Sequence, residues 1–171
     1  MANSPFFSVI IPVYNRAAAL ARALESVRAQ TCQDFEIVVV DDGSADDPRA
    51  VVERIGDCRI RFLRQDNKGG GAARNTAIDH ARGRFIAPLD SDDIFLPQHL
   101  ERLKALLEGS RNLVGYARMR VDRGEGRVFL KPPRAIRPDE EMASYLLCDR
   151  GFVPTITIAV ERQMARRIRY H

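Results

Sequence analysis

The sequence predicts an α/β fold in which a mostly parallel sheet carries helices on both of its faces. Two observations support this prediction. Strand-like and helix-like segments alternate four times within the first 107 residues, and the strand-like segments are almost continuously apolar. Successive strand and helix units favour parallel strands joined by crossovers, and such strands are buried on both faces. The 171 residues suffice for one such domain, which needs neither disulfides nor a structural metal to hold its core.

Each element up to residue 107 has its own local signal. Strands are expected where β-branched and other apolar residues run together, at residues 7–13, 36–40, 60–63 and 85–89. Helices are expected between and after them, at residues 18–29, 48–55, 72–81 and 97–107. Asp47 followed by Pro48 is typical of an N-cap and a first helical residue.

The pattern is weaker after Gly109. The expected elements are strands at residues 112–121 and 127–130, a helix at 139–147, a strand at 155–160 and a short basic helix at 161–168. The net charge of +4 also arises here, because residues 1–110 carry 14 basic and 16 acidic side chains whereas residues 111–171 carry 13 and 7. The two parts of the chain therefore differ in pattern and in charge.

Composition argues against several classes of protein. No apolar run approaches the 18 or so residues of a transmembrane helix, and the N-terminus lacks a signal-peptide pattern. The three cysteines are widely spaced and odd in number, which disfavours a disulfide framework or a zinc site. The basic final third has no RNP-like or zinc-finger pattern, so no nucleic-acid partner is expected. We therefore expect a soluble, cytoplasmic protein.

Polar clusters follow all four predicted strands, at the edge where open parallel sheets bind ligands. The most informative cluster is Asp90 to Asp93, which places three carboxylates within four residues. These carboxylates repel one another unless cations neutralise them, and their oxygens suit Mg²⁺ or Mn²⁺, with water and ligand oxygens completing the shell. The alternative is that Asp92 or Asp93 only caps the following helix, and the two roles are compatible.

Other polar residues at this edge fit a nucleotide. A carboxylate of Asp41 or Asp42 could accept hydrogen bonds from a ribose hydroxyl or a base N–H, although Asp41 could instead fix the backbone of the turn. Tyr14 offers a flat face for stacking a base, or edge packing. Arg74 follows the glycines at positions 69–71 and could pair with phosphate. This loop matches neither the dinucleotide fingerprint nor the P-loop.

Four segments together resemble family 2 glycosyltransferases, which have the Rossmann-like GT-A fold. They are FSVIIPVYNR, FEIVVVDDGSADD, NKGGGAARNTAIDHARG and FIAPLDSDDIFLP, in the order and at the spacing of that family over about residues 6–107. The resemblance implies transfer of a sugar, with inversion, from a nucleoside diphosphate, usually UDP, to a saccharide or lipid-linked acceptor. It also implies that residues 1–110 form the nucleotide-sugar-binding region.

The resemblance implies roles at the nucleoside end of the donor. Pro12 and Tyr14 would line the uracil. Asp42 would accept a hydrogen bond from the uracil N3–H, and Asp41 would support the turn or the ribose.

It also implies roles at the diphosphate. Asp92 would be the direct ligand of Mn²⁺ or Mg²⁺, and Asp90 would lie nearer the ribose or the metal. The metal and Arg74 would offset the charge that builds on the leaving diphosphate while an acceptor hydroxyl attacks the anomeric carbon from the opposite face.

The sequence departs from this family at the general base, which in the family is a carboxylate beyond a strand and helix that resemble residues 155–168. No such carboxylate follows before His171. Asp149 and Glu161 are weaker candidates, and the acidic run Asp139, Glu140 and Glu141 fits the first turn of a helix better. We therefore expect residues 111–171 to be a truncated acceptor-side region whose general base lies beyond position 171; the alternative is a naturally short member whose base comes from elsewhere. The alternative function is a catalytically silent nucleotide-sugar-binding module.

The final predicted helix is strongly basic. Its arginines are Arg162, Arg166, Arg167 and Arg169. A solvated helix face explains them best, and contact with acidic headgroups at the inner face of the membrane is the alternative.

Overall fold

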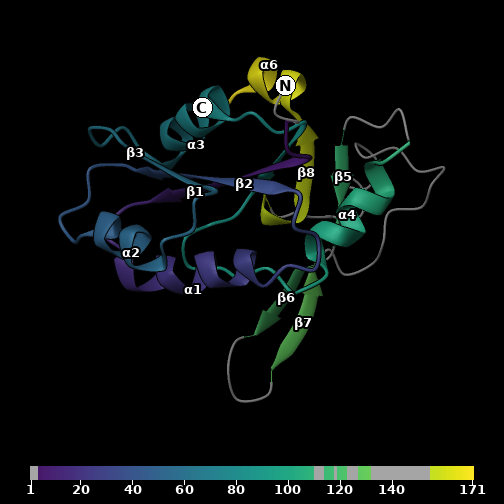
Figure 1. Ribbon diagram of the computed structural model, residues 1–171, viewed down its shortest axis with the longest axis horizontal. Helices are drawn as coiled ribbons and strands as arrows, with labels where there is room; N and C mark the ends of the chain where they lie inside the picture. Colours follow the sequence, from purple (N-terminus) through teal and green to yellow (C-terminus); the bar gives the residue numbers. More distant parts are fainter. Residues whose placement is uncertain (1–3, 110–113, 118, 123–126, 132–154) are drawn as a thin grey trace.

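The computed structural model describes residues 4–109, 114–117, 119–122, 127–131 and 155–171. It contains a six-stranded sheet in the order β3-β2-β1-β4-β8-β5 and a separate two-stranded sheet of β6 and β7 (Figure 1). The strands are β1 (Phe7–Val13), β2 (Phe35–Asp41), β3 (Ile60–Arg64), β4 (Phe85–Pro88), β5 (Val114–Tyr116), β6 (Met119–Asp122), β7 (Val128–Lys131) and β8 (Ile158–Glu161). The helices are α1 (Ala17–Arg28), α2 (Pro48–Ile55), α3 (Gly70–His80), α4 (His99–Leu107) and α6 (Arg162–Ile168), with a 3-10 turn at Thr155–Thr157.

The large sheet is mostly parallel, as predicted. β1 pairs in parallel with both β2 and β4, so that Phe7 lies opposite Phe35 on one side and Phe85 on the other. β3 extends the parallel set beside β2. β8 is antiparallel to its two neighbours, β4 and β5. The carboxyl ends of β1 to β4 therefore meet at one edge of the sheet.

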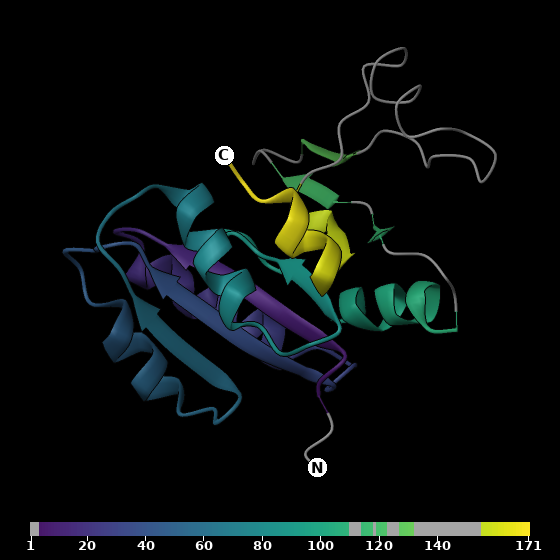
Figure 2. The same ribbon diagram turned by 90° about the horizontal axis from the view of Figure 1, so that it is seen from above.

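Helices cover both faces of this sheet, which confirms the predicted α/β class (Figures 1 and 2). Helices α1, α2 and α4 pack on one face, where they share a core with Val9 and Ile11 of β1. Helices α3 and α6 pack on the other face, where Ile10 of β1 points. All seven residues of β1 are buried, because alternate side chains enter opposite cores.

The predicted boundaries up to residue 107 are confirmed to within two residues. α2 begins at Pro48, and the Asp47 carboxylate accepts a hydrogen bond from the Ala50 amide at 3.1 Å, as an N-cap does. α4 begins at His99, two residues later than expected. The Pro97 carbonyl instead accepts a hydrogen bond from the Thr31 amide at 2.8 Å, which fixes the approach to the helix.

The expected single strand over residues 112–121 is wrong, because this stretch contributes to two sheets. β5 pairs with β8, where Gly115 lies opposite Ala159, and β6 pairs with β7 in the small sheet. Ala117 lies between them, and its amide donates to the Thr157 carbonyl at 2.7 Å. The strand expected at 155–160 begins as a 3-10 turn, and the helix expected at 139–147 lies outside the described residues.

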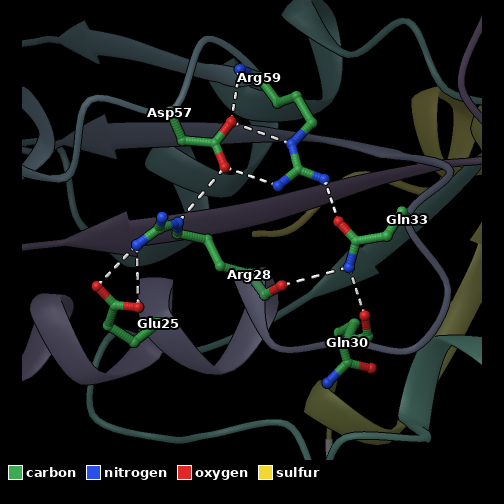
Figure 3. Close-up of polar contacts among 6 residues, drawn as sticks. All are labelled: Glu25, Arg28, Gln30, Gln33, Asp57 and Arg59. Carbon is green, nitrogen blue, oxygen red and sulfur yellow. Dashed lines mark hydrogen bonds and ion pairs between the residues drawn. The ribbon is translucent and has the colours of Figure 1, made fainter.

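A charged network ties α1 to the start of β3 at the amino ends of the strands (Figure 3). Arg59 donates from Nε and Nη2 to the two carboxylate oxygens of Asp57, at 3.0 and 2.7 Å, and from Nη1 to Gln33. Arg28 lies between Asp57 and Glu25, with its nitrogens 3.5 and 3.0 Å from their oxygens. The hydrogen bonds from Arg59 lower the pKa of Asp57 to about 2 although burial raises it. The charged side chains of this network are therefore paired with one another and stabilise the amino edge of the sheet.

The basic helix α6 docks on α3. Arg162 and Arg166 donate to the carbonyls of Ala81 and Asp79 at 3.1 and 3.0 Å, and Arg169 pairs with the Asp79 carboxylate at 2.7 Å. Cations at the carboxyl end of a helix interact favourably with its dipole. Arg166 and Arg167 are exposed, as expected for a solvated helix face, whereas Arg162 and Arg169 are partly buried. No helix in the described part of the chain combines the length and apolarity needed to cross a membrane.

Substitution of Gly83 by alanine is expected to destabilise the fold strongly. A Cβ at this position would lie 2.5 Å from backbone atoms of Phe7 and Ser8, which cannot move without disturbing β1. We expect Gly83→Ala to lower the free energy of unfolding by about 3 kcal/mol. At Gly109 a Cβ meets no atom within 4 Å and only the positive φ of 74° opposes it, so Gly109→Ala should cost about 1 kcal/mol. Equal losses in urea unfolding would contradict this account.

Acidification should destabilise the fold through His99. Its ring stacks on Phe95 with 4.1 Å between centroids, its Nε2 has no hydrogen-bond partner within the described part of the chain, and burial lowers its pKa from 6.5 to about 4. Because the unfolded chain binds the proton more tightly, stability is lost from about pH 6.5 downward. The loss reaches about 3 kcal/mol below pH 4. His99→Phe keeps a stacking ring and should remove this part of the pH dependence; an unchanged difference between pH 7 and pH 4 in urea unfolding would refute it.

Candidate functional site

A pocket of about 380 Å³ opens at the carboxyl edge of the parallel strands. Its lining residues are Pro12, Val13, Tyr14, Arg16, Asp42, Gly70, Arg74, Asp90, Ser91 and Asp92. The pocket forms where β1 and β4 separate, because their pairing ends at Ile10 and Pro88 while β1 continues to Val13. Of the residues predicted to bind nucleotide or metal, the pocket brings together all except Asp41.

Asp42 is a buried carboxylate on one wall of this pocket. Its Oδ1 accepts hydrogen bonds from the Gln65 side chain at 2.8 Å and from the Lys68 amide at 3.0 Å. Its Oδ2 accepts one from the Gly69 amide at 2.8 Å. Gly69 has a φ of 87°, which turns these amides toward the carboxylate at the entrance to α3. Asp42 thus fixes the glycine loop, and its Oδ2 retains a second lone pair for a ligand.

Asp41 has a different environment. Its side chain is fully buried, accepts from the Ser44 amide at 2.9 Å and pairs with Arg64 at 2.6 Å. Arg64 lies directly opposite Asp41 in the register of β2 and β3. These contacts fix the backbone of the turn after β2, one of the two roles predicted for Asp41.

Asn15 joins two loops at the pocket. Its side chain accepts from the Ala45 amide at 2.7 Å, and its own amide donates to the Ser44 hydroxyl at 2.9 Å. Its φ of 51° is unusual for a residue other than glycine, although asparagine tolerates it best. This turn carries Tyr14 on one side, with half of its surface exposed, and Arg16 on the other.

The aspartates that follow β4 are paired with arginines from other elements. Arg74 of α3 forms an ion pair with Asp90, and Arg16 forms one with Asp92 at 2.5 Å. Burial raises the pKa of Asp93, and the charges of Asp90 and Asp92 raise it further. Three carboxylates therefore face two arginines, which leaves negative charge at this turn.

The turn after β4 could supply two carboxylate ligands to a divalent cation. Among the described residues no group of three or more His, Cys, Asp and Glu side chains is arranged to hold a metal ion. Asp90 and Asp92 supply hard oxygen donors, and the surplus negative charge felt by Asp93 favours a cation. The remaining ligands would have to come from water or from a bound phosphate.

Sequence reasoning missed Arg16 and Arg64 as partners of the aspartates. A signal for Arg64 exists, because parallel pairing of the predicted second and third strands places it opposite Asp41. The contact of Arg16 with Asp92 depends on the direction of a turn side chain, which no periodicity encodes.

Of the weak candidates for a general base, only Glu161 lies within the described residues. It pairs with Phe85, the first residue of β4, and therefore lies at the sheet edge opposite the pocket. Its carboxylate caps α6 by accepting from the Met164 amide at 3.0 Å. Asp149 and residues 139–141 lie outside the described part of the chain.

Curated relatives of this chain are glycosyltransferases and polysaccharide biosynthesis proteins. The amylovoran biosynthesis glycosyltransferase AmsB of Erwinia amylovora is 30% identical over 174 residues, which cover 96% of this chain and 58% of AmsB. The succinoglycan biosynthesis protein ExoO of Rhizobium meliloti is 47% identical over 100 residues, which cover 58% of this chain and 29% of ExoO. The matched part of this chain thus spans little more than half of AmsB and less than a third of ExoO.

Solved structures share its fold. S. aureus TarS 1-349 superposes with a TM-score of 0.75 at 25% identity, covering 94% of this chain and 48% of the TarS 1-349 chain. The same TarS segment has been solved in complex with UDP and with UDP-GlcNAc. The mannosyltransferase PcManGT from Pyrobaculum calidifontis, in complex with GDP-Man and Mn²⁺, matches with a TM-score of 0.70 at 19% identity and shows the fold alone.

The family model described as Glycosyl transferase family 2 matches residues 8–169, which include every residue of the pocket. The resemblance read from the four sequence segments is thereby confirmed, together with the GT-A fold. This chain belongs to glycosyl transferase family 2.

Proposed function

We propose that this chain binds a nucleoside diphosphate sugar, with UDP as the nucleotide, and contributes to inverting transfer of the sugar to a saccharide or lipid-linked acceptor. One observation carries the proposal: a single pocket is lined by an exposed aromatic ring, a buried carboxylate and an arginine beside two aspartates. The aromatic ring could stack on the nucleotide base, the buried carboxylate could accept a hydrogen bond from an N–H group of that base, and the arginine with the two aspartates could hold the diphosphate and a cation. The complexes of TarS with UDP and UDP-GlcNAc support the choice of nucleotide.

The nucleoside would bind at the β1 side of the pocket. Pro12 and Tyr14 offer apolar and aromatic surface, and Tyr14 is exposed enough to stack on a base. Asp42 is held rigidly by the glycine loop, so its free lone pair could accept the uracil N3–H without rearrangement.

The diphosphate would bind between α3 and the turn after β4. Arg74 lines the pocket there, and its Nε has no hydrogen-bond partner among the described residues. Asp92 and Asp90 would hold Mn²⁺ or Mg²⁺, with Asp92 released from Arg16. When bound, such a cation offsets negative charge on the leaving diphosphate. Arg74 would orient the same phosphates, and the acceptor hydroxyl would attack the anomeric carbon from the opposite side.

The division of the chain into a donor-binding region at residues 1–110 and an acceptor-side region at 111–171 is part of this proposal. All residues that line the pocket fall between Pro12 and Asp92, which supports the first assignment.

UDP binding should depend on Mn²⁺ through Asp92. In calorimetry we expect Mn²⁺ to tighten UDP binding at least tenfold and Asp92→Asn to abolish that gain. Replacement of a carboxylate by an amide removes the charge that attracts the cation and weakens the oxygen ligand. Glu53→Gln alters an exposed carboxylate of α2 outside the pocket and should retain the Mn²⁺ effect. UDP binding that is independent of Mn²⁺ in the wild-type chain would contradict the metal site.

Asp42 should act on the nucleoside rather than on the phosphates. We expect Asp42→Asn to weaken uridine and UDP by the same factor, about tenfold, because an N–H acceptor is replaced by a group that also donates. Thermal unfolding in parallel separates this effect from loss of the glycine loop. If the variant lost affinity for UDP but not for uridine, the assignment of Asp42 to the base would be wrong.

A further inference from the structure

A segment far from the pocket in sequence contacts its arginine. After α6 the chain turns back over the first half of α3, and Tyr170 places its ring 5.4 Å from the guanidinium carbon of Arg74. A cation within about 6 Å of an aromatic ring centroid is attracted by the ring face. The Nη2 of the same guanidinium forms the ion pair with Asp90. Arg74 therefore contacts both the turn after β4 and the segment after α6.

The backbone of Tyr170 is fixed by a pair of hydrogen bonds to α3. The Asn75 side chain donates to the Tyr170 carbonyl at 2.8 Å and accepts from the Tyr170 amide at 2.9 Å. Asn75 is adjacent to Arg74, so the residue that holds the tyrosine lies beside the residue that the tyrosine contacts. The side chain of an asparagine matches a backbone amide in both directions only when the two are coplanar and close.

The turn that delivers Tyr170 is held in an unusual conformation. Arg169, which ends α6, has a φ of 52°, a value that residues with a side chain rarely adopt. Its guanidinium pairs with Asp79 at 2.7 Å, which anchors the turn on α3. Near the start of the same helix, a Cβ on Gly71 would lie 3.4 Å from the Tyr170 Cβ and the His171 carbonyl, so the segment lies closely over α3. A strained backbone persists only where the surrounding contacts determine it.

We propose that Tyr170 is a positioning residue that orders the Arg74 guanidinium for binding the diphosphate of the donor. This inference rests on the proposed function, because that proposal assigns the diphosphate to Arg74. An arginine side chain that is already ordered loses less freedom when it binds a ligand. The guanidinium carbon lies over the Tyr170 ring, and this contact is compatible with hydrogen bonds from the guanidinium N–H groups to phosphate.

The first test measures binding. We expect Tyr170→Leu to weaken UDP between about threefold and tenfold, the range that one cation–π contact supplies, and to leave uridine unchanged. Tyr170→Phe keeps the ring and should bind UDP within about twofold of the wild type. Ile168→Ala, at an exposed position of α6, is the matched control and should change neither ligand. Equal losses for UDP and uridine, or a loss in Tyr170→Phe as large as in Tyr170→Leu, would refute positioning.

The second test needs no ligand and separates this inference from the proposed function. The Arg74 Nε–H is buried, so its NMR signal should exchange slowly with water in the wild type and in Tyr170→Phe. It should broaden or exchange rapidly in Tyr170→Leu, and Arg74→Lys assigns the signal. An unchanged signal in Tyr170→Leu contradicts the inference whatever UDP does. A wild-type chain that orders Arg74 through Tyr170 but does not bind UDP would refute the proposed function alone.

Discussion

The burial of the central strands on both faces determines where polar chemistry can occur in this protein. Every residue of β1 is buried, and its one hydroxyl, on Ser8, donates to Glu36 of the neighbouring strand. Polar side chains that must contact a ligand are therefore confined to the strand ends. Because the strands are parallel, those ends meet, and Tyr14, Asp42 and Asp90 converge although 76 positions separate the first from the last.

The aspartates after β4 repel one another, and two arginines from other elements offset this repulsion by pairing with Asp90 and Asp92. The two ion pairs differ in exposure: the side chains of Arg16 and Asp92 are 55% and 48% exposed, whereas those of Arg74 and Asp90 are 20% and 34% exposed. Exposed ion pairs contribute little to stability, generally below about 1 kcal/mol. The contact of Arg16 with Asp92 is thus the more exposed of the two, and Asp92 is the more exposed carboxylate. Under the proposed function, a metal ion would replace Arg16 at Asp92.

The sequence predicted what depends on local pattern and missed what depends on register and side-chain direction. The four strand and helix units, the N-cap at Asp47 and the gathering of polar residues at one edge all follow from periodicity and turn chemistry. The pairing of Arg64 with Asp41 required the register of two strands, 23 residues apart in sequence. The division of residues 112–121 between two sheets required knowledge of β8, which joins the large sheet from more than 30 positions later.

Helix α3 packs with α6 on one face of the sheet and also supplies Arg74 to the pocket. The side chains that it buries are Ala73, Ala77 and Ile78, so two of its three buried residues contribute little apolar area. Small residues let the helix approach the sheet closely, which brings Arg74 within reach of Asp90. They also leave the helix with weak apolar anchoring, and its polar contacts to α6 and the following segment must then contribute more to its position. The segment after α6 both packs on α3 and contacts Arg74 through Tyr170. A change that loosens this segment should therefore lower the stability of this face of the sheet and also disturb the position of Arg74 in the pocket.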